Sequence, residues 1–247
     1  MLIGNDGIDV LARRVVGGDD VVSMHLPFDP SLSSPASAVE EIVYSNPMLL
    51  MPFGKIDIVF SGGFSLVVPS GTAIDDIDSL FPSSEPTVTL SVKADNRNDI
   101  VFRVDRDMYN FIIRTFDSVV PVHSLAVLAG YFNYRSHLGN SNKMYAVMGG
   151  STMEVLIFNH VGLAMASSFV CPDVNTVAYY VLASANTAAF DFTNDEVRIA
   201  GFPDRRAAIT PVLKRFMRHV IPAVFPASAA EVPPTVPFTL VVLPLCE

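Results

Sequence analysis

The sequence contains no tryptophan and only two cysteines, Cys171 and Cys246. Two cysteines this far apart cannot build a disulfide framework, and neither has a Cys or His neighbour at the spacing of a zinc site. We therefore interpret both as buried residues that fill a core, and we expect no metal centre.

Long hydrophobic runs are also missing. A membrane-spanning helix needs roughly 20 apolar residues in succession, whereas the longest candidates, near residues 119–128 and 238–245, are interrupted by Pro, His or Ser. The first residues, Met1 to Asp6, lack the basic segment and apolar core of a secretory signal. These absences predict a cytoplasmic protein without a membrane span.

Basic residues are scarce. The sequence has 16 Lys and Arg and 25 Asp and Glu, which gives a formal net charge of −9. A nucleic-acid binder needs clustered Lys and Arg to neutralise phosphates. The one dense basic stretch is Lys214, Arg215, Arg218 and His219, which we interpret as a solvated surface at a helix C-terminus. A nucleic-acid partner is not expected.

Hydrophobic residues, in contrast, make up 50% of the 247 residues, and only 17% are charged. Such a composition indicates many strands and helices that are buried on most sides. The length is enough for two lobes of roughly 100 to 150 residues, each with its own core.

The second half of the chain has the clearest pattern. Residues 143–148 are apolar after Lys143, as expected for a strand covered on both faces. Gly149-Gly150 then supplies a two-residue hairpin turn, residues 153–157 alternate as a second strand, and residues 163–169 return as a third.

A helix, a strand, a helix and a strand follow this meander. Residues 174–188 carry one apolar stripe at helical spacing, and Val197 and Ile199 indicate a short strand. We interpret Thr210 and Pro211 as the start of the next helix, which continues through Val220, and residues 238–245 as the last strand. The intervening Pro-rich residues 221–237 are either an arm that contacts a partner or an ordered surface loop without one.

The first half repeats this order less clearly. Asn5-Asp6-Gly7 is a hairpin turn, so either the strand before it is limited to Met1 to Ile3 or the natural start has been clipped. A second turn, at Gly17 to Asp20, joins strands at residues 8–14 and 21–26. The further elements predicted are helices at 36–44, 72–81, 106–116 with Asp105 as its cap, and 124–134, and strands at 55–60, 88–94, 100–104 and 119–122.

The polar residues 135–142 separate the two halves, so we place the first lobe at residues 1–134 and the second at residues 135–247. Three segments then resemble one family: Leu138-Gly139-Asn140 with Lys143-Met144-Tyr145, the pair Asn110-Phe111, and the end of the chain from Pro237 to Glu247. This is an uncharacterised bacterial domain-of-unknown-function family that has the fold of the actin-like ATPases.

The resemblance covers nearly the whole chain and implies an α/β fold without an assigned activity. Two duplicated ribonuclease-H-like lobes are expected, each a mixed five-stranded sheet flanked by helices, with a cleft between them. In related actin-like proteins this cleft holds ATP, and some members serve as cytoplasmic assembly platforms.

The residues of a nucleotide site are only partly present. An actin-like ATPase needs a carboxylate at the end of the first strand of each lobe to hold hydrated Mg²⁺, next to glycines whose amides approach the phosphates. In the second lobe that carboxylate position is Val147. In the first lobe it is Asn5, or it has moved by one place to Asp6.

The adenosine-contacting turn is also altered, because Gly201 is followed by Phe202, whose bulk would crowd a base. Each glycine has a plain structural explanation as well, since Gly149-Gly150 suits a hairpin and Gly201 a corner between a strand and a helix. The candidate cleft residues are Asp6, Gly7, Gly149, Gly150, Ser151 and Gly201.

A ribonuclease-H nuclease would need several carboxylates around two metal ions. The strands of the second lobe offer only Glu154 and Glu196, and we interpret both as facing solvent. A nuclease is therefore not expected.

Two hypotheses remain. The first is a non-catalytic actin-like protein with a degenerate nucleotide site that acts as a protein-interaction or assembly module and needs no cofactor. The second is an ATP-binding switch or weak ATPase that uses ATP and Mg²⁺ in the cleft. A protein partner, so far unidentified, is expected in the first case, and a homo-oligomer is compatible with both.

Overall fold

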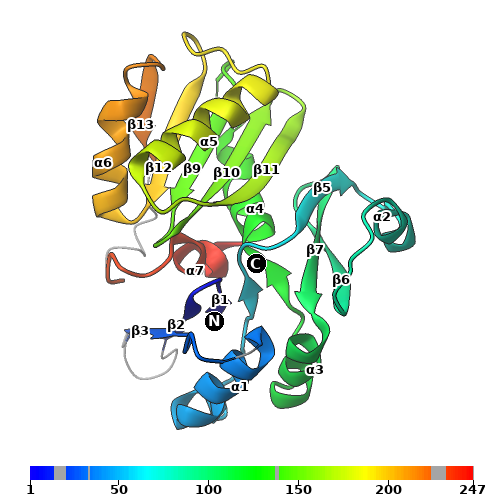
Figure 1. The fold of residues 1–247 in the computed structure, drawn as a ribbon. Helices are drawn as coiled ribbons and strands as arrows, with labels where there is room; N and C mark the ends of the chain where they lie inside the picture. The colour runs from blue at the N-terminus through cyan, green and yellow to red at the C-terminus, as the bar shows by residue number, and fades with distance from the viewer. Residues whose placement is uncertain (14–20, 33, 137–138, 224–231, 247) are drawn as a thin grey trace.

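The computed structural model describes residues 1–13, 21–32, 34–136, 139–223 and 232–246. Two five-stranded mixed sheets form the two lobes, and a three-stranded antiparallel sheet belongs to the first lobe (Figure 1). The strand order is β3-β2-β1-β4-β8 in the first sheet and β11-β10-β9-β12-β13 in the second. In both, an antiparallel meander is followed by two strands parallel to its first strand, so the predicted duplication is confirmed.

The strands of the first sheet are short at its centre. They are β1 (Leu2–Ile3), β2 (Gly7–Arg13), β3 (Val21–Pro27), β4 (Val59–Phe60) and β8 (Val122–His123). β4 and β8 are therefore only the ends of the strands predicted at residues 55–60 and 119–122, and Val120 is 76% exposed. The predicted turn at Gly17 to Asp20 lies outside the described residues.

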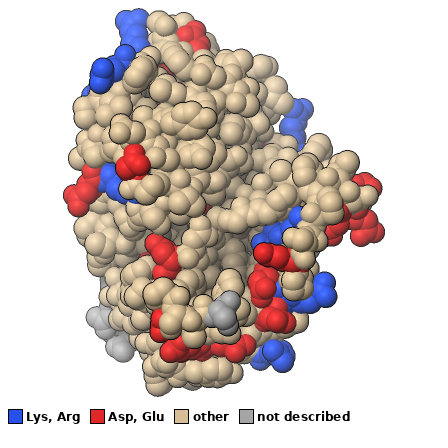
Figure 2. Space-filling model, in the orientation of Figure 1, with Lys and Arg blue, Asp and Glu red and all other residues tan. Residues whose placement is uncertain are grey.

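Helices and a second small sheet complete the first lobe. These elements are α1 (Pro35–Ser45), the 3-10 turn η1 (Pro47–Leu50), β5 (Ser65–Pro69), α2 (Ile74–Leu80), β6 (Thr87–Lys93), β7 (Asn98–Asp105) and α3 (Arg106–Thr115). β5 was not predicted, and it pairs with β7, which in turn pairs with β6. Figure 2 shows the acidic side chains that gather around α2, where Asp75 and Asp76 lie in the first turn.

The second lobe confirms the predicted meander and long helix. Its elements are β9 (Lys143–Met148), β10 (Thr152–Asn159), β11 (Gly162–Val170), α5 (Val174–Thr187), β12 (Glu196–Gly201), α6 (Pro203–Leu213) and β13 (His219–Pro222). The hairpin turn is centred one residue later than predicted, because the amide of Gly149 donates to the carbonyl of Thr152 at 2.9 Å.

The prediction of a helix from Thr210 to Val220 was wrong. The helix α6 begins at Pro203, which suits the first helical position because proline lacks the amide hydrogen that would be unpaired there. Pro211 instead lies inside α6, near its end. Val220 belongs to β13, which runs parallel to β12 at the sheet edge.

The prediction of a final strand at residues 238–245 was also wrong. These residues form the helix α7 (Phe238–Val242) and the 3-10 turn η3 (Leu243–Leu245). All five residues of α7 are buried. A helix buried on every side and a strand covered on both faces give the same apolar run, so the pattern could not separate them.

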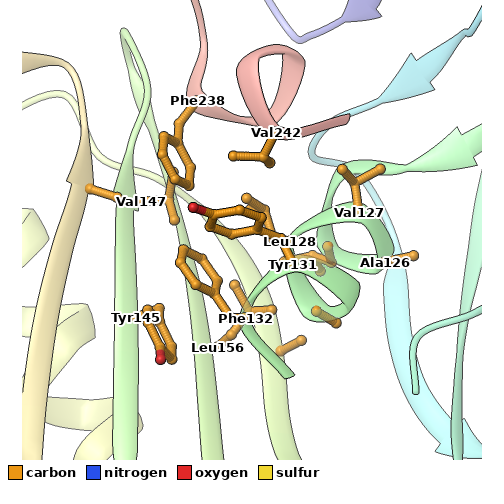
Figure 3. Close-up of a cluster of buried hydrophobic side chains, with 14 of the residues drawn as sticks. Ala126, Val127, Leu128, Tyr131, Phe132, Tyr145, Val147, Leu156, Phe238 and Val242 are labelled. Carbon is orange, nitrogen blue, oxygen red and sulfur yellow. The ribbon is translucent and has the colours of Figure 1, made fainter. Parts of the chain in front are cut away.

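The helix α4 (Ser124–Ser136) links the lobes and, together with α7, packs in the core between them. Figure 3 shows the aromatic side chains of α4 and α7 gathered beside β9 and β10, among them Tyr131, Phe132 and Phe238. The ring of Phe132 stacks on that of Phe238 with 5.8 Å between centroids. The boundary expected at residues 134/135 falls within α4 and stays a prediction.

The two cysteines differ in environment. Cys171 is fully buried in the core between the second sheet and α5 and α6, as predicted. Cys246 is exposed, so its interpretation as a buried residue was wrong. Neither forms a disulfide.

Candidate functional site

A cavity of about 300 Å³ lies between the two lobes. Its walls are the β1–β2 turn of the first lobe and the equivalent β9–β10 turn of the second, together with the N-terminal end of α7. Because the two sheets share one topology, their first hairpins meet across this space. The volume is at the lower limit of the range typical of small-molecule sites.

Four of the six candidate residues line this cavity: Asp6, Gly149, Gly150 and Ser151. The hydroxyl of Ser151 donates a hydrogen bond to Asp6 at 3.2 Å and so joins the two turns. Asp6 lies in the turn rather than in a regular strand, which allows its side chain to face the other lobe.

The other two candidates, Gly7 and Gly201, are not among the cavity-lining residues, and both have structural reasons to be glycine. A Cβ on Gly7 would lie 2.5 Å from the carbonyl oxygen of Leu26 on β3. Gly201 has a φ of +89°, and a Cβ there would lie 2.0 Å from the carbonyl oxygen of Met148. Both glycines therefore permit the close approach of neighbouring strands.

Phe202 occupies the position expected to crowd a base. It lines the cavity, and its ring edge would lie 3.8 Å from a Cβ on Gly150. Its amide donates to the carbonyl of Met148 at 3.0 Å, which fixes the backbone from which the ring projects. The aromatic ring thus stands beside the glycine turn.

Val147 is 4% exposed and belongs to the apolar core between the lobes. The same core includes Phe238 and Val242 of α7 and Leu128 of α4 (Figure 3). The position that would carry a metal-handling carboxylate is therefore part of a hydrophobic contact.

Glu154 does not face solvent, so its interpretation as an exposed strand residue was wrong. It is 6% exposed and accepts hydrogen bonds from the hydroxyls of Ser61, at 3.3 Å, and of Ser124. A third hydrogen bond comes from Thr239. Burial raises the pKa of Glu154 to about 7, although the three hydrogen bonds act to lower it.

The sequence carried a signal for the burial of Glu154. Leu156 and Phe158 share its face of β10, and both are fully buried against α4, whereas Met153, Val155 and Ile157 are buried on the opposite face. A strand that is apolar on both faces leaves no solvent side for a charged residue. Glu196, by comparison, is half-buried and pairs with Arg198 at 2.7 Å.

His25 and Asp9 form a second polar group in the cavity, which the sequence pattern did not indicate. They are direct partners in the register of β2 and β3, and their side chains are 2.9 Å apart. Burial raises the pKa of Asp9, and the hydrogen bond from His25 opposes this shift.

Acidic groups dominate the cavity. Asp6, Asp9 and Glu154 all line it, and its described lining includes no Lys or Arg. Within the described ranges, no three His, Cys, Asp or Glu side chains converge closely enough to hold a metal ion. Nor does this part of the chain contain a helix of the length and hydrophobicity needed to cross a membrane.

Comparison with known protein families shows to which family the chain belongs. The family model described as "Protein of unknown function (DUF3822)" matches residues 8–220. The chain belongs to the DUF3822 family. No curated protein matches this DUF3822 chain.

Solved structures show its fold. A Bacteroides thetaiotaomicron protein with actin-like ATPase fold and unknown function is 21% identical, with a TM-score of 0.82 over 100% of the DUF3822 chain and 95% of that chain. The PilM-PilN type IV pilus biogenesis complex gives 10% identity and a TM-score of 0.59 over 99% and 97%. The DUF3822 chain therefore has the actin-like ATPase fold predicted from its sequence.

Proposed function

We propose that this protein is a non-catalytic actin-like module with a degenerate nucleotide site, which acts in the cytoplasm by binding another protein. The observation that carries the proposal is the burial of Val147 against α7. A carboxylate at that position would anchor hydrated Mg²⁺, whereas a valine packed against Phe238 leaves the cation without this ligand.

The charge of the cavity supports the same proposal. A triphosphate carries several negative charges and needs Lys, Arg or a metal ion nearby. Here three carboxylates line the cavity, its described lining includes no Lys or Arg, and the neighbouring Arg205 of α6 already donates to the carbonyls of Gly150 and Cys171. Phe202 further narrows the space beside Gly150.

A role in assembly rests on the fold and on composition. PilM, a similar structure, is found in a complex with PilN. For the DUF3822 chain a protein partner or a second copy of the chain is compatible with the fold, and the net charge of −9 argues against nucleic acid.

Thermal unfolding with and without Mg-ATP tests the proposal. A ligand at about 100 times its dissociation constant stabilises a protein by roughly 2.7 kcal/mol and raises the midpoint by several degrees. We expect no shift at millimolar Mg-ATP.

The second candidate function is an ATP-binding switch. It is favoured by the Ser151–Asp6 hydrogen bond, which brings the glycine turn to a carboxylate, and by the position of Glu154 directly across from Val147 on the neighbouring strand. A midpoint shift with Mg-ATP that is lost in Gly150→Phe would establish the switch and overturn the non-catalytic proposal. Gly54→Phe is the matched control, because a Cβ at Gly54 meets nothing within 4 Å.

A further inference from the structure

Glu154 joins the second lobe to three separate elements. It lies on β10 opposite Val147 of β9 and Ser168 of β11. Its hydrogen-bond donors come from outside this sheet: Ser61 after β4, Ser124 at the start of α4, and Thr239 in α7. One buried carboxylate of the second lobe is thus hydrogen-bonded to the first lobe and to both helices between the lobes.

No positive charge faces this carboxylate among the described residues that line the cavity. The titratable groups there are Asp6 from the β1–β2 turn, Asp9 from β2 and His25 from β3. His123, next to Ser124, faces Gly62 with a ring-nitrogen-to-carbonyl distance of 3.1 Å, and burial lowers its pKa to about 4, so it is neutral near pH 7. Each hydroxyl partner of Glu154 is uncharged.

We infer that Glu154 is a proton-operated latch, which holds the lobes together when it is protonated and favours their separation when it is ionised. The protonated carboxyl is uncharged, accepts hydrogen bonds and donates one of its own. The carboxylate is a buried charge without a counter-charge, and a burial of this kind is costly. Opening of the cavity admits water to the carboxylate and removes that cost.

The ionisation falls in the neutral range because the pKa of Glu154 is about 7.

A second contact between the lobes does not titrate in this range. The amide of Leu163, at the far end of the second sheet, donates to Asp95 at 3.2 Å. Burial raises the pKa of Asp95, but hydrogen bonds from Arg97, Asn98 and Leu163 outweigh it and lower the pKa below its ordinary value. This contact therefore persists across the neutral range and serves as the pivot.

The distance between the lobes as a function of pH tests the latch. Cysteines for a pair of labels are introduced at two exposed positions, Glu41 on α1 and Asn186 on α5, in a Cys246→Ser background. Cys171 is fully buried and stays unlabelled. The label separation is then measured from about pH 5.5 to about pH 8.5, a range that spans ionisation of this carboxyl.

The latch predicts that the separation increases as the pH rises toward 7, the pKa of Glu154 in the closed protein, and levels off above it. In Glu154→Gln, which cannot ionise, the separation stays short at every pH. The control is Glu196→Gln, because Glu196 lies in the same sheet but pairs with Arg198. It keeps the pH response of the unsubstituted protein.

A separation that does not change with pH, or a Glu154→Gln variant that follows the unsubstituted curve, would overturn the inference. If Glu154→Gln does not fold, Ser61→Ala and Thr239→Val replace it. Each removes a hydroxyl donor that favours the carboxylate, so the pKa of Glu154 rises and the separation levels off at a higher pH. A separation that levels off at an unchanged pH in both variants counts against the latch.

Discussion

At the scale of single residues, Glu154 links protonation to folding. An ordinary glutamate has a pKa near 4.5, and burial raises that of Glu154 to about 7. Between these values the folded protein keeps a proton that the unfolded chain has released. Its free energy of unfolding therefore falls as the pH rises through this window, and the stabilisation is complete only below it.

We predict that Glu154→Gln removes this dependence. The difference in free energy of unfolding between the variant and the unsubstituted protein should shift in favour of the variant by roughly 3 kcal/mol between about pH 4.5 and about pH 8. This magnitude follows from the size of the pKa shift. Urea unfolding at several pH values measures the difference between the two proteins. Parallel stability curves would contradict the prediction.

Individual residues also show what sequence reasoning could reach. Asp105 as a helix cap follows from the chemistry of a short carboxylate before a helix, which is a local property. It is equally visible in the sequence that Val147 stands where the family resemblance leads one to expect a carboxylate. The burial of Glu154 depends on α4 and α7 covering its face of the sheet, and these contacts come from residues about 30 or more positions away along the chain.

At the scale of elements, α3 offers a test of local stabilisation. The side chain of Asp105 accepts a hydrogen bond from the amide of Met108 at 2.9 Å and so pairs one of the free amides of the first turn.

We predict that Asp105→Ala lowers the free energy of unfolding by about 1 kcal/mol, the usual cost of a lost N-cap. Asp107→Ala is the matched control, because Asp107 lies in the same turn without a cap bond, so its loss should cost only a few tenths of a kcal/mol. Chemical denaturation distinguishes the two variants. Equal losses would show that charge rather than capping stabilises α3.

The elements that were predicted wrongly share one cause. Pro211 is usual at the start of a helix, but the tertiary structure accepts it near the end of α6. The apolar run from Phe238 also suits a strand. In the structure, however, the edge of the second sheet beside β12 is occupied by β13. In both cases tertiary packing, which a local pattern does not contain, decided between two local possibilities. Asp173 before α5 had no such competitor, and its side chain caps the helix by accepting from the amides of Asn175 and Thr176.

At the scale of the whole molecule, the lobes share one hydrophobic core. It contains Leu2 and Val59 from the first sheet, Val147 and Leu156 from the second, and α7 with Phe238. We therefore predict that the protein unfolds in a single cooperative transition.

A chain that ends at Ala223 should lose this cooperativity, because it lacks α7 and its buried apolar residues. Calorimetry would then show separate transitions or a midpoint many degrees lower. An unchanged single transition would mean that α7 does not couple the lobes. The duplication itself was visible in the sequence. So were β6 and β7 of the three-stranded sheet inserted between β4 and β8, whereas its third strand, β5, was not predicted.

The position of Phe202 has a practical consequence. The chain has no native tryptophan, so Phe202→Trp would create the sole indole fluorophore, in the cavity lining beside Gly150. Its emission wavelength would respond to hydration there, and quenching by a dissolved small molecule would reveal how freely that space exchanges with bulk solution. This single substitution would therefore give a tryptophan signal that reports only on the region between the two hairpins.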